Sequence, residues 1–163
     1  PMGTPVNLQA QFPIPCVLYV DDELSNLQAF MAAFRKDFKV LVATSLPDAL
    51  ELLATNDVHV VVADQRMPGT IGTELLACVR DRFPRVRRML MTGYSDIQAV
   101  IDAINNGGVM RYISKPWEPE QVLLAVRTAF NDIRNERDKE ENVERLKECN
   151  SQLEFALRQA LLS

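Results

Sequence analysis

Five short apolar runs alternate with longer segments of helical periodicity along residues 15–130, and this alternation constrains the fold most strongly. Each run has four to six residues, whereas the segments between them repeat apolar residues every three or four positions. Such alternation is typical of βα units around a parallel sheet. The predicted strands are Cys16–Val20, Lys39–Ala43, Val58–Ala63, Arg88–Met91 and Met110–Ile113.

The third run has the character of a central strand. It is apolar on both faces apart from His59, as a strand covered by helices on both sides must be. Ser45 is suited to cap the second helix, and Gly107 with Gly108 ends the fourth. We therefore expect an α/β fold with a doubly wound parallel sheet. The predicted helices between the strands are Leu24–Arg35, Leu46–Ala54, Thr73–Phe83 and Ile97–Ile104.

Polar residues follow four of the five predicted strands. In open parallel sheets, ligands bind outside the carboxyl ends of the strands, so residues at these positions meet at one edge. A capping or turn role explains each of them singly, but not their combination. The residues are Asp21, Asp22 and Glu23 after the first strand, Asp64 after the third, Thr92 after the fourth and Lys115 after the fifth.

The charges at this edge predict a metal site. Asp21, Asp22 and Asp64 with Lys115 leave about two negative charges uncompensated, which a hard divalent cation would balance. All-oxygen ligation favours Mg²⁺, Mn²⁺ or Ca²⁺ over zinc, and the only histidine, His59, lies inside a predicted strand.

Phosphoryl transfer suits this set of residues. Mg²⁺ is usually shared with a phosphate, and a carboxylate such as Asp64 can be the nucleophile. The transferred group then needs charge neutralisation, which the Lys115 ammonium and the Thr92 hydroxyl can provide together with Mg²⁺.

The four motifs "VLYVDDE", "VVVADQRMPG", "MLMTGYSD" and "YISKPW", in this order, resemble the receiver domain of bacterial two-component response regulators over residues 15–130. The resemblance implies a flavodoxin-like (βα)5 fold with strand order 2-1-3-4-5 and Asp64 as the phosphoacceptor. It further implies phosphorylation by a sensor histidine kinase or a phosphotransfer protein, and a signalling role rather than that of an enzyme.

The same resemblance assigns roles to the remaining residues of the site. Mg²⁺ would be held by acids of the first and third strand ends and by one backbone carbonyl. A hydroxyl and an ammonium would contact the phosphoryl group, and a tyrosine would change rotamer with the hydroxyl. The implied metal ligands are Asp21, Asp22, Asp64 and the Arg66 carbonyl; the phosphate contacts are Thr92 and Lys115; the switch residues are Thr92 and Tyr112.

An aspartate-nucleophile phosphohydrolase of the haloacid dehalogenase type is the main alternative. It also uses carboxylates, a hydroxyl, a lysine and Mg²⁺ on a parallel sheet. That class requires an Asp-x-Asp-x-Thr motif after the first strand, where this chain has "DDELS". Nucleotide-binding motifs of the GxGxxG and GxxxxGK[ST] types are absent from the sequence.

The last predicted helix begins near Pro119 and meets no Gly or Pro up to the final residue. Its apolar stripe is interrupted at Arg137 and Glu140 and then resumes out of phase, which indicates a coiled coil with a break. We expect residues 131–163 to form a coiled-coil linker of a parallel homodimer that leads to a missing output domain. A solvated helix, or one packed back on the domain, is the alternative. The resumed stripe is Val143, Leu146, Asn150, Leu153, Leu157 and Ala160.

Charge and composition limit the other function classes. The net charge is −4, and residues 131–163 contain eight acids and six bases, so we expect no direct contact with nucleic acid. The basic run from Arg80 to Arg88 is expected to be a solvated helix end and loop.

The rest of the composition predicts a location inside the cell. The three cysteines are odd in number and far apart, and residues 1–14 form a tail without the pattern of a secretory leader. No run approaches the ~20 apolar residues of a membrane span. We therefore expect a cytoplasmic protein without membrane contact.

Overall fold

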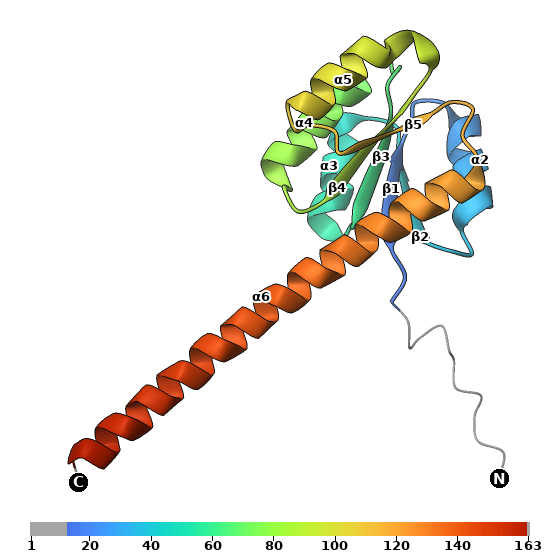
Figure 1. The fold of residues 1–163 in the computed structure, drawn as a ribbon. Coiled ribbons are helices and arrows are strands. Elements are labelled where there is room, and N and C mark those ends of the chain that lie inside the picture. Colours follow the sequence, from blue (N-terminus) through green and yellow to red (C-terminus); the bar gives the residue numbers. More distant parts are fainter. Residues whose placement is uncertain (1–12, 163) are drawn as a thin grey trace, which may run out of the picture. The chain divides into compact units, whose positions relative to one another are not determined.

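The computed structural model describes residues 13–162, except for the side chain of Tyr94, so most of the expected tail 1–14 lies outside the described residues. Five parallel strands form one sheet in the order β2-β1-β3-β4-β5 (Figure 1). This order and the expected flavodoxin-like architecture are therefore confirmed. The strands are β1 (Cys16–Val20), β2 (Lys39–Ala43), β3 (Val60–Asp64), β4 (Arg87–Thr92) and β5 (Arg111–Ser114).

Helices cover both faces of the sheet, as expected for a doubly wound fold (Figure 1). A single 3-10 turn, η1, follows β4 and leads directly into the next helix. The helices are α2 (Leu24–Phe34), α3 (Leu46–Thr55), α4 (Gly72–Arg82), η1 (Tyr94–Asp96), α5 (Ile97–Asn105) and α6 (Pro119–Leu162).

The core consists of two apolar layers because successive strand residues point to opposite faces. Leu18 and Val61 face the layer that includes buried residues of α3, α4 and α5. Val17 and Val62 face the other layer, with buried residues of α2 and the first turns of α6. All five residues of β1 and of β3 are buried, which confirms β3 as a central strand.

An aromatic cluster fills the layer between the sheet and α2. Tyr19 stacks on Phe30 with ring centroids 4.2 Å apart and an interplanar angle of 10°. Phe34 lies between Phe38 and Trp117, with centroid distances of 5.5 and 5.4 Å. The rings thus connect β1 with the segment that follows β5.

The residues predicted to begin and end two helices do so. The Ser45 hydroxyl accepts a hydrogen bond from the backbone N–H of Asp48 at the start of α3. Gly107, just beyond α5, has φ +76°, which glycine adopts without strain. The strand β3 begins two residues later than predicted, since Val58 N–H donates to the nearby Asn56 carbonyl.

One expectation for the basic run is wrong. Arg88 is buried in β4 instead of solvated. Its guanidinium donates to the carbonyls of Pro84, Val86, Gly107 and Gly108, at 2.9 to 3.3 Å. Five fixed donors allow arginine to satisfy several carbonyls at once, so burial here is compatible with its charge. The side chain ties the connection before β4 to the connection before β5.

The chain divides by its internal contacts into two units, with the boundary between Phe130 and Asn131. The helix α6 runs through this boundary without interruption. In the second unit, Val143, Leu146, Leu153 and Leu157 are exposed. Between residues 13 and 162, no helix has the length and apolar character that crossing a membrane requires.

Candidate functional site

The register of the sheet brings two of the predicted acids together. Ala63 of β3 pairs with Val20 of β1, and each is followed directly by an aspartate. Asp64 is therefore the last residue of β3, and Asp21 lies beside it just beyond β1. Both carboxylates are almost fully buried, whereas Asp22 is exposed.

The three aspartates form one cluster. Asp21, Asp22 and Asp64 each offer a carboxylate oxygen, and these oxygens lie within 4.8 Å of one another. A set of hard, anionic oxygen ligands of this size fits Mg²⁺ or another hard divalent cation.

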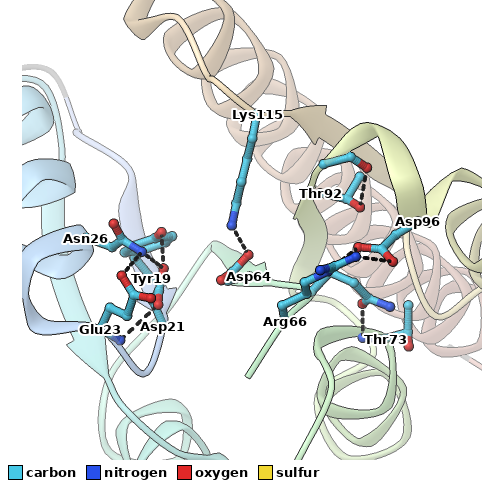
Figure 2. A network of polar contacts seen from close by, with 12 residues as sticks. Tyr19, Asp21, Glu23, Asn26, Asp64, Arg66, Thr73, Thr92, Asp96 and Lys115 are labelled. Carbon is cyan, nitrogen blue, oxygen red and sulfur yellow. Dashed lines mark hydrogen bonds and ion pairs between the residues drawn. The ribbon is translucent and has the colours of Figure 1, made fainter. Parts of the chain in front are cut away.

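Lys115 reaches the cluster from the segment after β5 and forms an ion pair with Asp64 Oδ1 (Figure 2). Burial raises the pKa of the Asp64 carboxyl above its ordinary value. The Lys115 ammonium acts in the opposite direction, and the neighbouring Asp21 adds to the increase. The single positive charge of Lys115 therefore does not fully offset the cost of ionising Asp64.

Asp21 is held in place by three hydrogen bonds (Figure 2). Its Oδ2 accepts from the Tyr19 hydroxyl at 2.8 Å and from Asn26 Nδ2 at 3.0 Å. Its Oδ1 accepts from the Glu23 backbone N–H at 3.0 Å. Burial and the adjacent Asp21 carboxylate raise the pKa of Tyr19, so the phenol stays protonated and acts as a donor.

The two predicted switch residues lie on neighbouring strands. Thr92 ends β4 in a buried position, and its hydroxyl donates to the Gly93 carbonyl at 3.2 Å. Tyr112 on β5 is 53% exposed. Thr92 pairs with Ser114 across β4 and β5, so the end of β4 lies beside the end of β5.

The Arg66 side chain points away from the aspartate cluster toward the turn after β4 (Figure 2). Its Nε donates to Asp96 Oδ2 at 3.0 Å, and its Nη2 donates to the Ser95 hydroxyl at 2.8 Å. The guanidinium is largely exposed. Arg66 thereby connects the loop after β3 with the turn that precedes α5.

Sequence reasoning missed two residues that support the site. Gln65 is buried, and its Oε1 accepts from Thr73 N–H in the first turn of α4 at 3.0 Å, which fixes the loop after Asp64. For Tyr19 the sequence predicts no more than a place in the apolar strand Cys16–Val20. The signal that finds it is the strand period, because Tyr19 and Asp21 are two residues apart and share a face.

Residues 17–127 match the family model described as the response regulator receiver domain. The chain belongs to this family. Its matched segment contains the aspartate cluster, Thr92 and Lys115. The comparisons support the signalling function and not the haloacid dehalogenase alternative.

Two similar curated proteins are hydrogenase transcriptional regulatory proteins named HoxA. The one from Bradyrhizobium diazoefficiens is 37% identical over 124 residues, which cover 76% of this chain and 26% of that protein. The one from Cupriavidus necator is 40% identical over 113 residues, which cover 69% of this chain and 23% of that protein. The chain thus spans about a quarter of the length of these relatives.

Solved structures show the same fold. The signal receiver domain of an HD domain-containing protein from Pseudomonas fluorescens is 33% identical, with a TM-score of 0.71 over 78% of this chain and 94% of that chain. A response regulator receiver domain from Clostridium thermocellum is 27% identical, with a TM-score of 0.70 over 74% and 98% of the two chains.

Proposed function

We propose that this receiver accepts a phosphoryl group on Asp64, with Mg²⁺ bound by Asp21, Asp22, Asp64 and the backbone carbonyl of Arg66. The observation that carries this proposal is the placement of Asp64. Its carboxylate is buried, forms an ion pair with Lys115 and lies beside two further acids. A bound cation would stabilise the ionised form of this carboxylate. In that form the carboxylate can act as a nucleophile toward phosphorus.

The reaction transfers a phosphoryl group from a phosphorylated histidine of a kinase or phosphotransfer protein. An Asp64 carboxylate oxygen attacks phosphorus, the O–P bond forms, and the N–P bond breaks with its electron pair going to the imidazole, which takes up a proton. Mg²⁺ held by these residues would supply positive charge to the phosphoryl oxygens. Lys115 supplies a second positive charge, and Thr92 supplies a hydroxyl donor.

The switch follows from the change in charge. Phosphorylation replaces one negative charge with about two and adds acceptor oxygens. The Thr92 hydroxyl then turns from the Gly93 carbonyl to the phosphoryl group, and the β4 end moves with it. Tyr112, exposed on the neighbouring strand, turns inward into the vacated space.

Intact-mass spectrometry after incubation with acetyl phosphate tests this function. Wild-type protein is expected to gain one phosphoryl group only when Mg²⁺ is present, and hydroxylamine should remove it. Asp64→Asn should gain none, whereas Asp81→Asn, which changes an exposed acid on α4, should behave as wild type. A phosphoryl group on Asp64→Asn would contradict the assignment of the acceptor. A folded wild type that stays unmodified and also fails to bind beryllofluoride with Mg²⁺ would contradict the function.

We further propose that the receiver dimerises through a parallel coiled coil of residues 131–163 with a second copy of this chain. Four apolar side chains on this part of α6 are exposed: Val143, Leu146, Leu153 and Leu157. With Asn150 between Leu146 and Leu153, the positions of this stripe are separated alternately by three and four residues. Helices of this composition are marginal in water without a partner. Asn150 lies on the same stripe, and a single asparagine at such a position specifies the register of a two-stranded coil.

Multi-angle light scattering on the full chain and on residues 1–130 tests the dimer. We expect a dimer for the full chain and a folded monomer for the truncated one. Leu153→Lys should also give a monomer, while Gln152→Lys, one position off the stripe, should leave the dimer intact. A full chain that remains a monomer at high concentration would contradict this proposal.

The coiled coil offers a route from Asp64 to a controlled output. The two HoxA relatives are transcriptional regulatory proteins that extend well beyond the matched region. By analogy with them, we propose that phosphorylation of this receiver alters the pairing of α6 and thereby regulates a transcriptional output. Fusion of the chain to a heterologous DNA-binding domain, with and without acetyl phosphate, measures this coupling. Reporter output that ignores phosphorylation would contradict it.

A further inference from the structure

Tyr19 reaches the aspartate cluster from inside the hydrophobic core. It lies on β1, 2% exposed, in the layer between the sheet and α2. Its ring stacks face to face on Phe30, and this packing restricts the orientation of the side chain. The hydroxyl, at the far end of this fixed ring, donates to Asp21 Oδ2 at 2.8 Å (Figure 2).

Three hydrogen bonds occupy most of the acceptor sites of the Asp21 carboxylate. A carboxylate has about four lone-pair sites, two on each oxygen. Tyr19 and Asn26 occupy both sites of Oδ2, and the Glu23 backbone N–H occupies one site of Oδ1. The remaining lone pair lies on Oδ1. Asp21 is therefore prepared to offer one oxygen, and only one, to a cation or to a water on that cation.

We propose that Tyr19 is a positioning residue that restricts Asp21 to its Oδ1 atom at the metal site and thereby favours Mg²⁺ over Ca²⁺. The inference rests on the proposed function, in which the cluster binds Mg²⁺.

The selectivity follows from the different demands of the two ions. Mg²⁺ requires near-ideal octahedral geometry, and each carboxylate usually gives it a single oxygen. Ca²⁺ takes six to eight oxygens and accepts carboxylates that bind with both. With Oδ2 held by Tyr19 and Asn26, Asp21 would have to break two hydrogen bonds before both of its oxygens could bind Ca²⁺. The same hydrogen bonds preserve the orientation that suits Mg²⁺.

Isothermal titration of the full chain with Mg²⁺ and with Ca²⁺ tests the proposal. Tyr19→Phe removes the hydroxyl and keeps the ring on Phe30. The Kd for Mg²⁺ is expected to rise about tenfold, the usual effect of losing a group that orients a metal ligand. The Kd for Ca²⁺ should rise much less, so that the ratio of the two constants changes. Thr55→Val, which removes a hydroxyl at the end of α3, should leave both constants unchanged.

A second variant tests the same hydrogen-bonding role without changing a residue of the hydrophobic core. Asn26→Ala removes the other donor to Oδ2 from a half-buried helix position and should change the ratio in the same direction. Melting in EDTA shows whether each variant folds. The inference would be overturned if the Kd values for Mg²⁺ and Ca²⁺ changed by the same factor, or did not change, in folded Tyr19→Phe and Asn26→Ala. The metal site itself would then still stand. Wild-type protein that binds neither ion would overturn the metal site and the inference with it.

Discussion

Asp64 carries a negative charge inside the protein, and this charge lowers stability when no metal is bound. Burial raises its pKa, so the folded state prefers the neutral form. The resulting penalty is absent below the ordinary pKa of an aspartate, grows as pH rises toward the raised value, and is complete above it. Replacing the charge with a neutral group should therefore stabilise the protein at neutral pH.

The prediction is that Asp64→Asn melts above wild type at pH 8 in EDTA, by about 2–4 °C for each kcal/mol gained in a chain of this size. The difference should shrink as pH falls and vanish below pH ~4. Differential scanning calorimetry across this range measures it, and the difference between the two proteins cancels the titration of the other acids. A variant that melts below wild type at pH 8 would show that the Lys115 ion pair outweighs the cost of burial.

Thr92 and Tyr112 should behave as one switch. Thr92→Ala retains Asp64 and Lys115, so it should still accept a phosphoryl group from acetyl phosphate. It should lose the phosphorylation-dependent change in Tyr112, because the hydroxyl that draws the β4 end inward is gone. Fluorine NMR of fluorotyrosine-labelled protein, assigned with Tyr112→Phe, measures this. A Tyr112 signal that still shifts in phosphorylated Thr92→Ala would contradict the coupling.

At the scale of single residues, the sequence predicts the polar residues of the site better than the residues that hold them in place by hydrogen bonds. Asp21, Asp64, Thr92 and Lys115 are recognisable because each follows a strand, and parallel strands end at one edge. The hydrogen bond of Tyr19 is harder to predict, since a tyrosine in a buried strand is usually no more than a core residue. The strand period places Tyr19 and Asp21 on one face, and the direction of the Tyr19 side chain then decides whether its hydroxyl meets the acid.

The start of α4 packs directly against the end of β3. A methyl group at Gly72 would overlap the backbone carbonyl of Asp64 and would lie 2.7 Å from Leu90 Cδ1. Gly72→Ala should therefore lower the free energy of unfolding by about 1–3 kcal/mol, the usual effect of overpacking. It should also slow the phosphorylation of Asp64, because relief of the overlap displaces that residue.

Urea denaturation and the rate of phosphate incorporation measure the two effects of Gly72→Ala. Gly108→Ala is the matched control, since an added methyl group there meets only ordinary contacts at 3.8 Å. Equal stability of the two variants would mean that α4 can move away from β3 without loss.

Arg88 joins two connections at the opposite end of the sheet from the aspartates. Lysine cannot serve the four carbonyls that the guanidinium reaches, because it has three donors on a compact head. Arg88→Lys should lose about 2–3 kcal/mol in urea denaturation, since buried carbonyls are left without donors. Arg111→Lys, on the exposed side of β5, should lose almost nothing. Similar stability of both variants would show that water replaces the guanidinium.

At the scale of elements, periodicity predicts the strands and helices, but it predicts neither the order of the strands in the sheet nor the burial of Arg88. The ends of β1 and β2 are as predicted, because the apolar runs stop where the strands stop. The strand order was implied by the resemblance and not by periodicity, since the sequence repeats look alike from one unit to the next. The burial of Arg88 was missed because a run of charges is normally solvated, and the carbonyls that receive it come from two distant loops.

The whole chain combines a receiver with a helix of 44 residues, and Asn150 is expected to control how two such helices pair. A buried asparagine selects a parallel pair with a defined register at a cost in stability. Asn150→Leu should therefore raise the melting temperature of the assembly and broaden its mass distribution beyond a dimer. Analytical ultracentrifugation measures both the affinity and the species. A weaker but still dimeric Asn150→Leu would contradict this role.

The position of Trp117 has a practical consequence. It is the only tryptophan in the chain, it packs against Phe30 and Phe34, and it follows Lys115 by two residues. Its indole therefore lies on the same short segment as the ammonium that forms an ion pair with Asp64. The emission of Trp117 should therefore change when Mg²⁺ or a phosphoryl group binds at the site, and a fluorescence titration without an attached dye measures this.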